Sequence, residues 1–137
     1  MIKVRQLANR LSRCYRRFSK DHEWVDLPDK STECSIGITD YAQNALGGVV
    51  YLSYPKIGEK FKSHEPMGEI ESPKAVSQIY APVSLQVTQV NNSLDNDLAQ
   101  INSKADSTWL YKGTVLEKKE FDSLLTLEEY NKLIEKH

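Results

Sequence analysis

One stretch decides the fold of this chain: Gly68-Glu69-Ile70-Glu71-Ser72-Pro73-Lys74-Ala75-Val76-Ser77. The residues on either side of its centre, 66–72 and 76–80, are rich in β-prone residues, and we expect two paired strands there. In a four-residue turn starting at Ser72, the fixed φ of Pro73 suits the second position. Lys74 then takes the third position and points into solvent.

A lysine on a turn is usually a solvated surface residue, or a charge that protects a strand edge from aggregation. A Schiff-base lysine needs a pocket or a cationic neighbour. Glu69 and Glu71 favour the charged ammonium instead. If Lys74 has a function, the sequence therefore indicates covalent modification, for which an exposed turn suits a swinging arm.

The rest of the chain predicts short strands and two helices. Residues 22–27 and 33–39 read as a hairpin around Pro28-Asp29-Lys30, and further strands are expected at 49–54, 85–90 and 108–116, with a polar connection at 91–104. A short helix over 40–46 is capped by Thr39 or Asp40 and ended by Gly47-Gly48. An amphipathic C-terminal helix follows Thr126. We predict a mostly β, flattened barrel or sandwich with an internal and a C-terminal helix.

Charge is segregated along the 137 residues. Residues 1–20 carry seven basic residues and no acid, which leaves 11 basic against 19 acidic residues and a net charge of −8 beyond them. Ile2, Val4, Leu7, Leu11 and Tyr15 fall near helical spacing among the arginines. Arginine-rich, acid-free amphipathic segments are typical of mitochondrial import. We predict a presequence over residues 1–18, cleaved after Phe18, and one domain over 19–137; a basic tail or a membrane-surface helix is the alternative.

Several classes of function are disfavoured by composition. The acidic body has no nucleic-acid patch, and no apolar run approaches the roughly 20 residues that span a bilayer. Cys14 and Cys34 predict no disulfide framework, and His22, His64 and His137 have no metal-ligand spacing.

The chain resembles the H protein of the glycine cleavage system. The matching motifs run in order through the chain and include His22-Glu23-Trp24-Val25, Gly37-Ile38-Thr39-Asp40-Tyr41-Ala42-Gln43, Leu46-Gly47-Gly48-Val49-Val50, Glu71-Ser72-Pro73-Lys74-Ala75, Tyr80-Ala81-Pro82-Val83-Ser84, Trp109-Leu110 and Glu128-Glu129-Tyr130. The lysine motif alone is weak. Its combination with the block at 37–43, at the right separation, is specific.

The resemblance implies a lipoyl-type barrel-sandwich fold and a carrier that is not itself an enzyme. By position Lys74 matches the family's lipoyl-lysine, within an attachment turn that includes Glu71, Ser72 and Ala75. The implied partners are the pyridoxal-phosphate glycine decarboxylase, the aminomethyltransferase, dihydrolipoamide dehydrogenase and a lipoylating enzyme, in the mitochondrial matrix. By resemblance Glu23 is a contact in the cleft that shelters the loaded arm; the alternative is a solvated strand residue.

The sequence departs from the family pattern near the lysine. Pro73 replaces a common valine, Gln78 replaces an acidic residue, and Leu85 replaces a glycine, which would strain the backbone if φ is positive there. These departures leave open a related carrier that relays lipoate to other enzymes. Two further alternatives are a biotinyl or lipoyl domain of a larger enzyme, in which methionines usually flank the lysine where this chain has Pro73 and Ala75, and a β-sandwich interaction module with an unmodified lysine.

Overall fold

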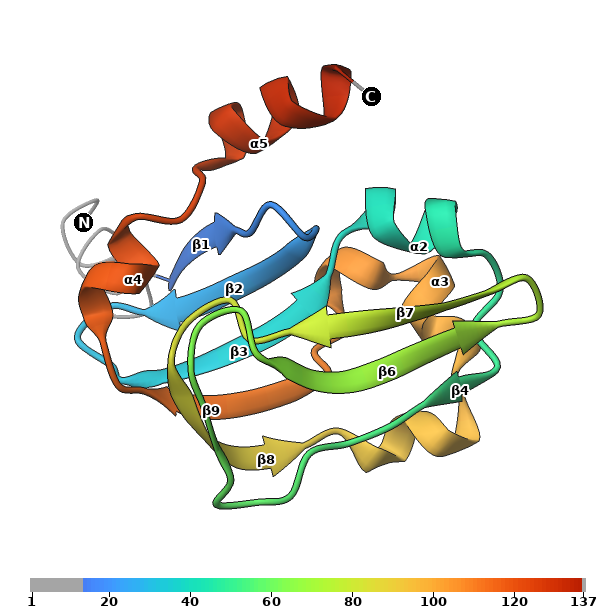
Figure 1. The fold of residues 1–137 in the computed structure, drawn as a ribbon, viewed down its shortest axis with the longest axis horizontal. Coiled ribbons are helices and arrows are strands. Elements are labelled where there is room, and N and C mark those ends of the chain that lie inside the picture. Colours follow the sequence, from blue (N-terminus) through green and yellow to red (C-terminus); the bar gives the residue numbers. More distant parts are fainter. Residues whose placement is uncertain (1–13, 137) are drawn as a thin grey trace, which may run out of the picture.

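Two antiparallel sheets form the centre of the protein, a computed structural model of which describes residues 14–136 (Figure 1). The larger sheet has the order β1-β2-β3-β9-β8-β5 and the smaller one β4-β6-β7. Their bounds are β1 Cys14–Phe18, β2 Glu23–Pro28, β3 Glu33–Ile38, β4 Tyr51–Leu52, β5 Lys60–Phe61, β6 Pro66–Ser72, β7 Ala75–Tyr80, β8 Leu85–Val90 and β9 Tyr111–Val115. One core joins the two sheets, with Ile36 and Val87 on the larger and Leu52 and Ile70 on the smaller. The mostly β sandwich is confirmed.

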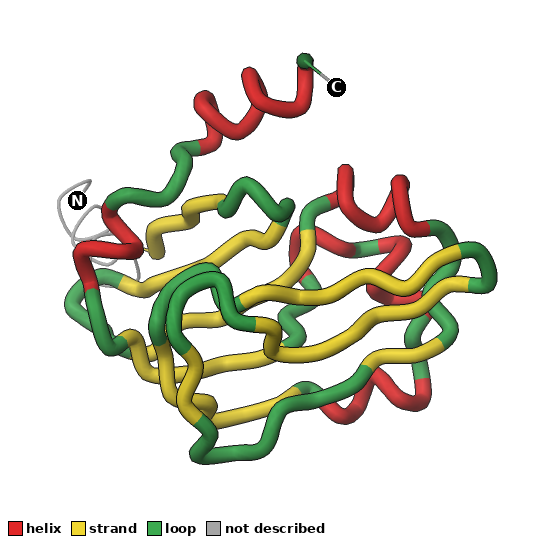
Figure 2. Tube along the Cα trace, viewed as in Figure 1, coloured by secondary structure: helices red, strands yellow, loops and turns green. Residues whose placement is uncertain are grey.

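Short helices lie at the two ends of the sandwich, and the last helix lies apart from them beside β1 (Figure 2). The helices are α2 Asp40–Leu46, η1 Asn92–Asn96, α3 Ala99–Ser103, η2 Ala105–Ser107, α4 Lys118–Asp122 and α5 Leu127–Glu135. Thr39 caps α2 as predicted, and Thr126 and Glu129 form a capping box at the start of α5. Within residues 14–136, no helix is long and apolar enough to cross a membrane.

The polar connection predicted over 91–104 instead contains η1 and α3, which bury Leu94 and Ile101. Two predicted strands are also shorter than expected, and at the N-terminal end of each a side chain bonds the backbone. The Val49 N–H donates to Asn102 Oδ1 at 2.9 Å, and Asn91 Nδ2 donates to the Trp109 carbonyl at 2.8 Å. A side chain that bonds a backbone group competes with strand pairing there.

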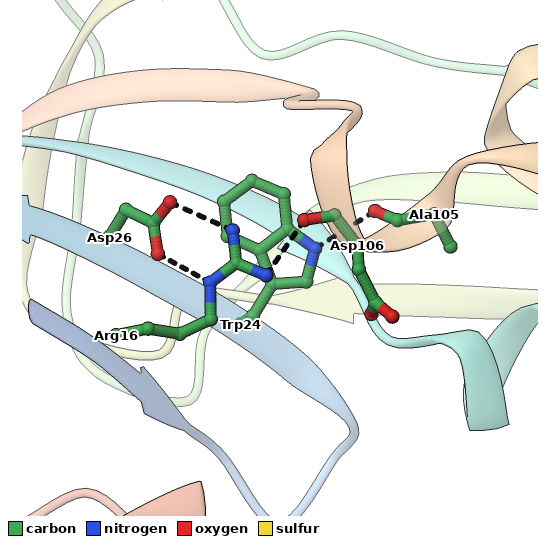
Figure 3. Close-up of polar contacts among 5 residues, drawn as sticks. All are labelled: Arg16, Trp24, Asp26, Ala105 and Asp106. Atoms are coloured by element: carbon green, nitrogen blue, oxygen red, sulfur yellow. Dashed lines mark hydrogen bonds and ion pairs between the residues drawn. The ribbon is translucent and has the colours of Figure 1, made fainter.

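Residues 1–13 of the predicted presequence lie outside the described residues, and its last five residues form a strand. Tyr15, which the helical spacing includes, lies in strand β1, and all five residues of β1 pair with β2. Figure 3 shows the Arg16 guanidinium over the face of the Trp24 indole, 4.1 Å from the ring centroid. Arg16 also donates to both carboxylate oxygens of Asp26, at 2.5 and 2.8 Å, and to the Asp106 carbonyl at 2.7 Å. The helical interpretation is therefore wrong for residues 14–18.

Phe18 joins β1 to the C-terminal part of the chain. It is buried, its ring stacks on Tyr130 of α5 at 4.7 Å, and its backbone exchanges two hydrogen bonds of 2.9 Å with Leu125. With Trp24, these side chains form a second, smaller hydrophobic cluster. Residues 14–18 are thus structural parts of the folded domain.

The replacement of a glycine by Leu85 causes no backbone strain. Leu85 lies in β8, is fully buried, and is not among the described residues with positive φ, which apart from glycine are His22, Lys30 and His64. Its Cδ1 lies 2.5 Å from where a Cβ on Gly113 would stand. The leucine therefore occupies space that Gly113 leaves open on the paired strand β9.

Candidate functional site

The β6–β7 hairpin presents Lys74 at its tip. Ser72 pairs with Ala75, so Pro73 and Lys74 alone form the loop, and both are exposed. The Ser72 hydroxyl oxygen is buried under the loop and accepts hydrogen bonds from the N–H groups of Lys74, at 3.3 Å, and Ala75, at 3.2 Å. The predicted turn is confirmed, and Ser72 fixes its shape from within.

The Lys74 side chain lies beside Gly47, the residue that ends α2. A Cβ built on Gly47 would stand 3.1 Å from Lys74 Cε and 3.8 Å from its Nζ. The tip of the hairpin thus lies against the loop between α2 and β4, as Figure 1 also shows. Gly47 has φ +96° and ψ −170°, a conformation that is essentially restricted to glycine.

An exposed row of side chains crosses the small sheet next to the lysine. Tyr51 pairs with Glu71 and Glu71 pairs with Val76, so the three side chains share one face. Tyr51 is 48% exposed and Val76 is 61% exposed. The backbone carbonyl of Glu71 accepts from Val50 N–H at 2.8 Å, which ties this row to the loop beside the lysine.

Glu23 lies at the other end of β7, away from Lys74. Its side chain is only 1% exposed, Ser19 donates a hydroxyl hydrogen bond to Oε1 at 2.5 Å, and Tyr80 N–H donates to Oε2 at 3.1 Å. Burial raises the pKa of Glu23 to about 7, and the two hydrogen bonds, which lower the pKa, offset only part of this rise. About 20 Å of strand separates Tyr80 from Lys74, so the structure does not bring Glu23 and Lys74 together.

Gln78, the residue that replaces a family acid, lies on the outer face of the hairpin. Its Nε2 donates to Glu69 Oε1 at 3.0 Å, across the pair that joins β6 to β7. The amide therefore bridges the two strands halfway along the hairpin.

A cavity of about 660 Å³ lies between α2 and α5, lined by Thr39, Tyr41, Leu127, Tyr130 and Ile134 among others. Lys74 does not line it.

Among the residues that the structure describes, no group of three His, Cys, Asp or Glu side chains is placed to hold a metal ion. What the site offers chemically is an accessible primary amine on a rigid turn.

Asn102 is the residue near the site that sequence reasoning missed. Its Nδ2 donates to the Gly47 carbonyl and to Gln43 Oε1, both at 2.9 Å, while its Oδ1 accepts from Val49. It lies in α3, where the sequence predicted only a polar connection. No local pattern in the sequence links Asn102 to a loop more than fifty residues away.

These features define a class of protein: a small β-sandwich carrier domain that displays one lysine at the tip of a hairpin. A family model described as "Glycine cleavage H-protein" matches residues 16–137. The glycine cleavage system H protein of Acidobacterium capsulatum is 41% identical over 118 residues, covering 86% of this chain and 90% of that protein. The H protein of Acidiphilium cryptum is 42% identical over 115 residues, covering 83% and 91%.

A solved structure agrees with these relatives. The crystal structure of a glycine cleavage system H protein from Mycobacterium marinum superposes with a TM-score of 0.75 at 36% identity, covering 88% of this chain and 96% of that one. The chain belongs to the glycine cleavage H-protein family. Members of this family are the carrier component of the glycine cleavage system. The chain has the barrel-sandwich fold that the sequence predicted.

Proposed function

We propose that this protein is a lipoyl carrier of a glycine cleavage system, with lipoate joined to Lys74 as an amide. In this role it moves the aminomethyl group of glycine from the glycine decarboxylase to the aminomethyltransferase, and dihydrolipoamide dehydrogenase reoxidises the arm. The observation that supports the attachment site most is the two-residue tip. It exposes the Lys74 amine, while Ser72 holds the turn from below.

The residues present fit a lipoyl group. Attached lipoate supplies a dithiolane that opens to take up and release the cargo. The chain's own contribution is to hold the lysine backbone still while the side chain stays accessible to several enzymes in turn. Glu71 and Ala75 flank the tip on the paired strand ends, as the attachment turn requires. In this proposal the body is a shuttled substrate and performs no catalysis.

Glu23 remains a proposed contact for the loaded arm. Because both of its carboxylate oxygens already accept hydrogen bonds, it would meet a cationic amine by giving up the bond from Ser19. Gln78 bonds Glu69 on the outer face and supplies no charge for that amine. Glu23, at the Tyr80 end of the hairpin, and Glu71, beside the tip, are the two carboxylates of the predicted site.

Intact mass of the native protein tests the attachment. In a host that makes lipoate, we expect a lipoyl-sized increment that peptide mapping places on Lys74. A strain that lacks its own H protein should regain glycine oxidation when it expresses this chain. An unmodified Lys74 would support the interaction-module alternative, and a lipoylated chain that fails to restore glycine oxidation would support the lipoate relay.

We also propose that the chain works in the mitochondrial matrix and that its import segment ends before Cys14. The basic, acid-free composition supports import. A cut after Phe18 would remove β1, whose Arg16 covers Trp24 and whose Phe18 packs on Tyr130. We expect N-terminal sequencing of the mature protein to find a start at or before Cys14. A start at Ser19 would contradict this boundary, and an intact Met1 would contradict processing altogether.

A further inference from the structure

We propose that Gly47, held in place by Asn102, is a positioning residue for the acylation of Lys74. This inference rests on the proposed attachment of lipoate to that lysine. Lys74 lies at the hairpin tip and Gly47 lies in a different part of the chain, so their approach is a tertiary contact. Gly47 supplies bare backbone on the side of the lysine that faces α2.

The approach is close along the end of the lysine side chain. From the position of a Cβ on Gly47, Lys74 Cε is 3.1 Å away, Nζ 3.8 Å and Cδ 3.9 Å. The first of these distances is shorter than ordinary van der Waals contact, so a methyl group there would shift the end of the lysine side chain by a few tenths of an ångström. With glycine, the lysine stem lies along the backbone, which limits the directions in which the amine projects.

Asn102 holds the backbone of residues 47–49 in place. Its side chain bonds the Gly47 carbonyl and the Val49 N–H, which lie on either side of Gly48. Its Nδ2 also bonds Gln43 Oε1, and Gln43 Nε2 donates in turn to Asp40 Oδ1 at 2.8 Å. The loop is therefore anchored to both α2 and α3, and it forms a rigid neighbour for a flexible side chain.

The acylation step depends on the direction in which the amine points. Lys74 Nζ loses a proton to solvent and attacks the acyl carbon of lipoyl adenylate, which a lipoate ligase makes from lipoate and ATP. The C–N bond forms, the bond from the acyl carbon to the phosphate oxygen breaks, and AMP leaves with the electron pair. The nitrogen releases a second proton to give the neutral amide. A small misplacement of a reacting atom can cost orders of magnitude in rate.

The chain offers a control for placing an alanine at a positive φ. Gly58 also has a positive φ, +91°, but nothing lies within 4 Å of a Cβ placed on it. Gly47→Ala and Gly58→Ala both put alanine at a positive φ, and only the first adds a methyl group beside the lysine. Asn102→Asp tests the same loop without placing an alanine at a positive φ. Aspartate keeps an oxygen that accepts from Val49 N–H and loses the N–H group that donates to the Gly47 carbonyl.

The experiment measures acylation of each purified, unmodified chain by a lipoate ligase with lipoate and ATP, followed by intact mass. We expect kcat for Gly47→Ala to fall about tenfold or more with KM little changed, while Gly58→Ala acylates like wild type, each measured well below the melting temperature of its own variant. Asn102→Asp should also lower kcat and leave KM little changed. Equal rates for Gly47→Ala and Gly58→Ala would overturn the positioning role, as would a full rate in Asn102→Asp. An unmodified wild type would overturn the lipoyl assignment itself.

Discussion

Lys74→Arg is expected to abolish lipoate attachment and, with it, glycine oxidation. The arginine guanidinium stays protonated and forms no amide under conditions that acylate an amine. Lys74 is exposed, and the shape of the turn depends on the Ser72 hydroxyl oxygen, which accepts from the backbone N–H groups of Lys74 and Ala75, and not on the lysine side chain. The variant should therefore fold like wild type, with a free energy of unfolding within about 0.5 kcal/mol.

The measurement pairs intact mass with complementation of a strain that lacks its own H protein. Lys56→Arg, another exposed lysine in the loop after β4, provides the control and should remain fully lipoylated. A lipoyl increment on the Lys74→Arg chain would show that another lysine is the attachment point. Loss of modification in both variants would instead indicate that the substitutions disturb recognition in general.

Glu23→Gln is expected to remove a large pH dependence from the stability of the fold. Burial holds the pKa of Glu23 at about 7 in the folded protein, against a value of 4.5 for an ordinary glutamate. Between these two values the folded chain binds a proton that the unfolded chain has released. The free energy of unfolding therefore falls as the pH rises through this window, by about 1.4 kcal/mol per pH unit and about 3 kcal/mol in total.

Glutamine mimics the protonated side chain and can keep both hydrogen-bond partners. Its amide oxygen can accept from Tyr80 N–H, and its amide nitrogen can donate to the Ser19 hydroxyl oxygen. We expect the variant to match wild type near pH 4.5 and to be more stable by about 3 kcal/mol at pH 8. Denaturant unfolding across this range measures the difference. Glu117→Gln, at an exposed glutamate before α4, should leave the pH profile unchanged. Parallel profiles for wild type and Glu23→Gln would disprove the burial argument.

Local patterns in the sequence predicted the parts of this fold that local chemistry decides. The turn at Ser72–Ala75, the Thr39 cap, the helix stop at Gly47 and the capping box at Thr126 each depend on residues within four positions of one another. The lysine at the hairpin tip followed from the same kind of signal.

The sequence could not predict contacts between distant segments. Arg16 read as part of a basic leader because its partners, Trp24, Asp26 and Asp106, become visible only once β1 pairs with β2. For Glu23 the sequence left open a cleft contact or a solvated strand residue, because no sequence pattern shows that the side chain is buried with hydrogen bonds from Ser19 and Tyr80; its burial excludes the solvated residue. Asn102 was missed for the same reason, since its three partners lie in another helix and the loop that follows it.

The contacts of Phe18 have a consequence for how the domain opens. Phe18 bonds Leu125 through its backbone and stacks on Tyr130, whose hydroxyl in turn lies 2.8 Å from His22 Nδ1 and 2.7 Å from Thr39 Oγ1. The first strand and the last helix therefore share one small cluster, separate from the main core. We expect the first strand and the last helix to open together, and amide hydrogen exchange of their N–H groups at one shared free energy would show it. The β6–β7 hairpin, which bears the lysine, lies outside that cluster.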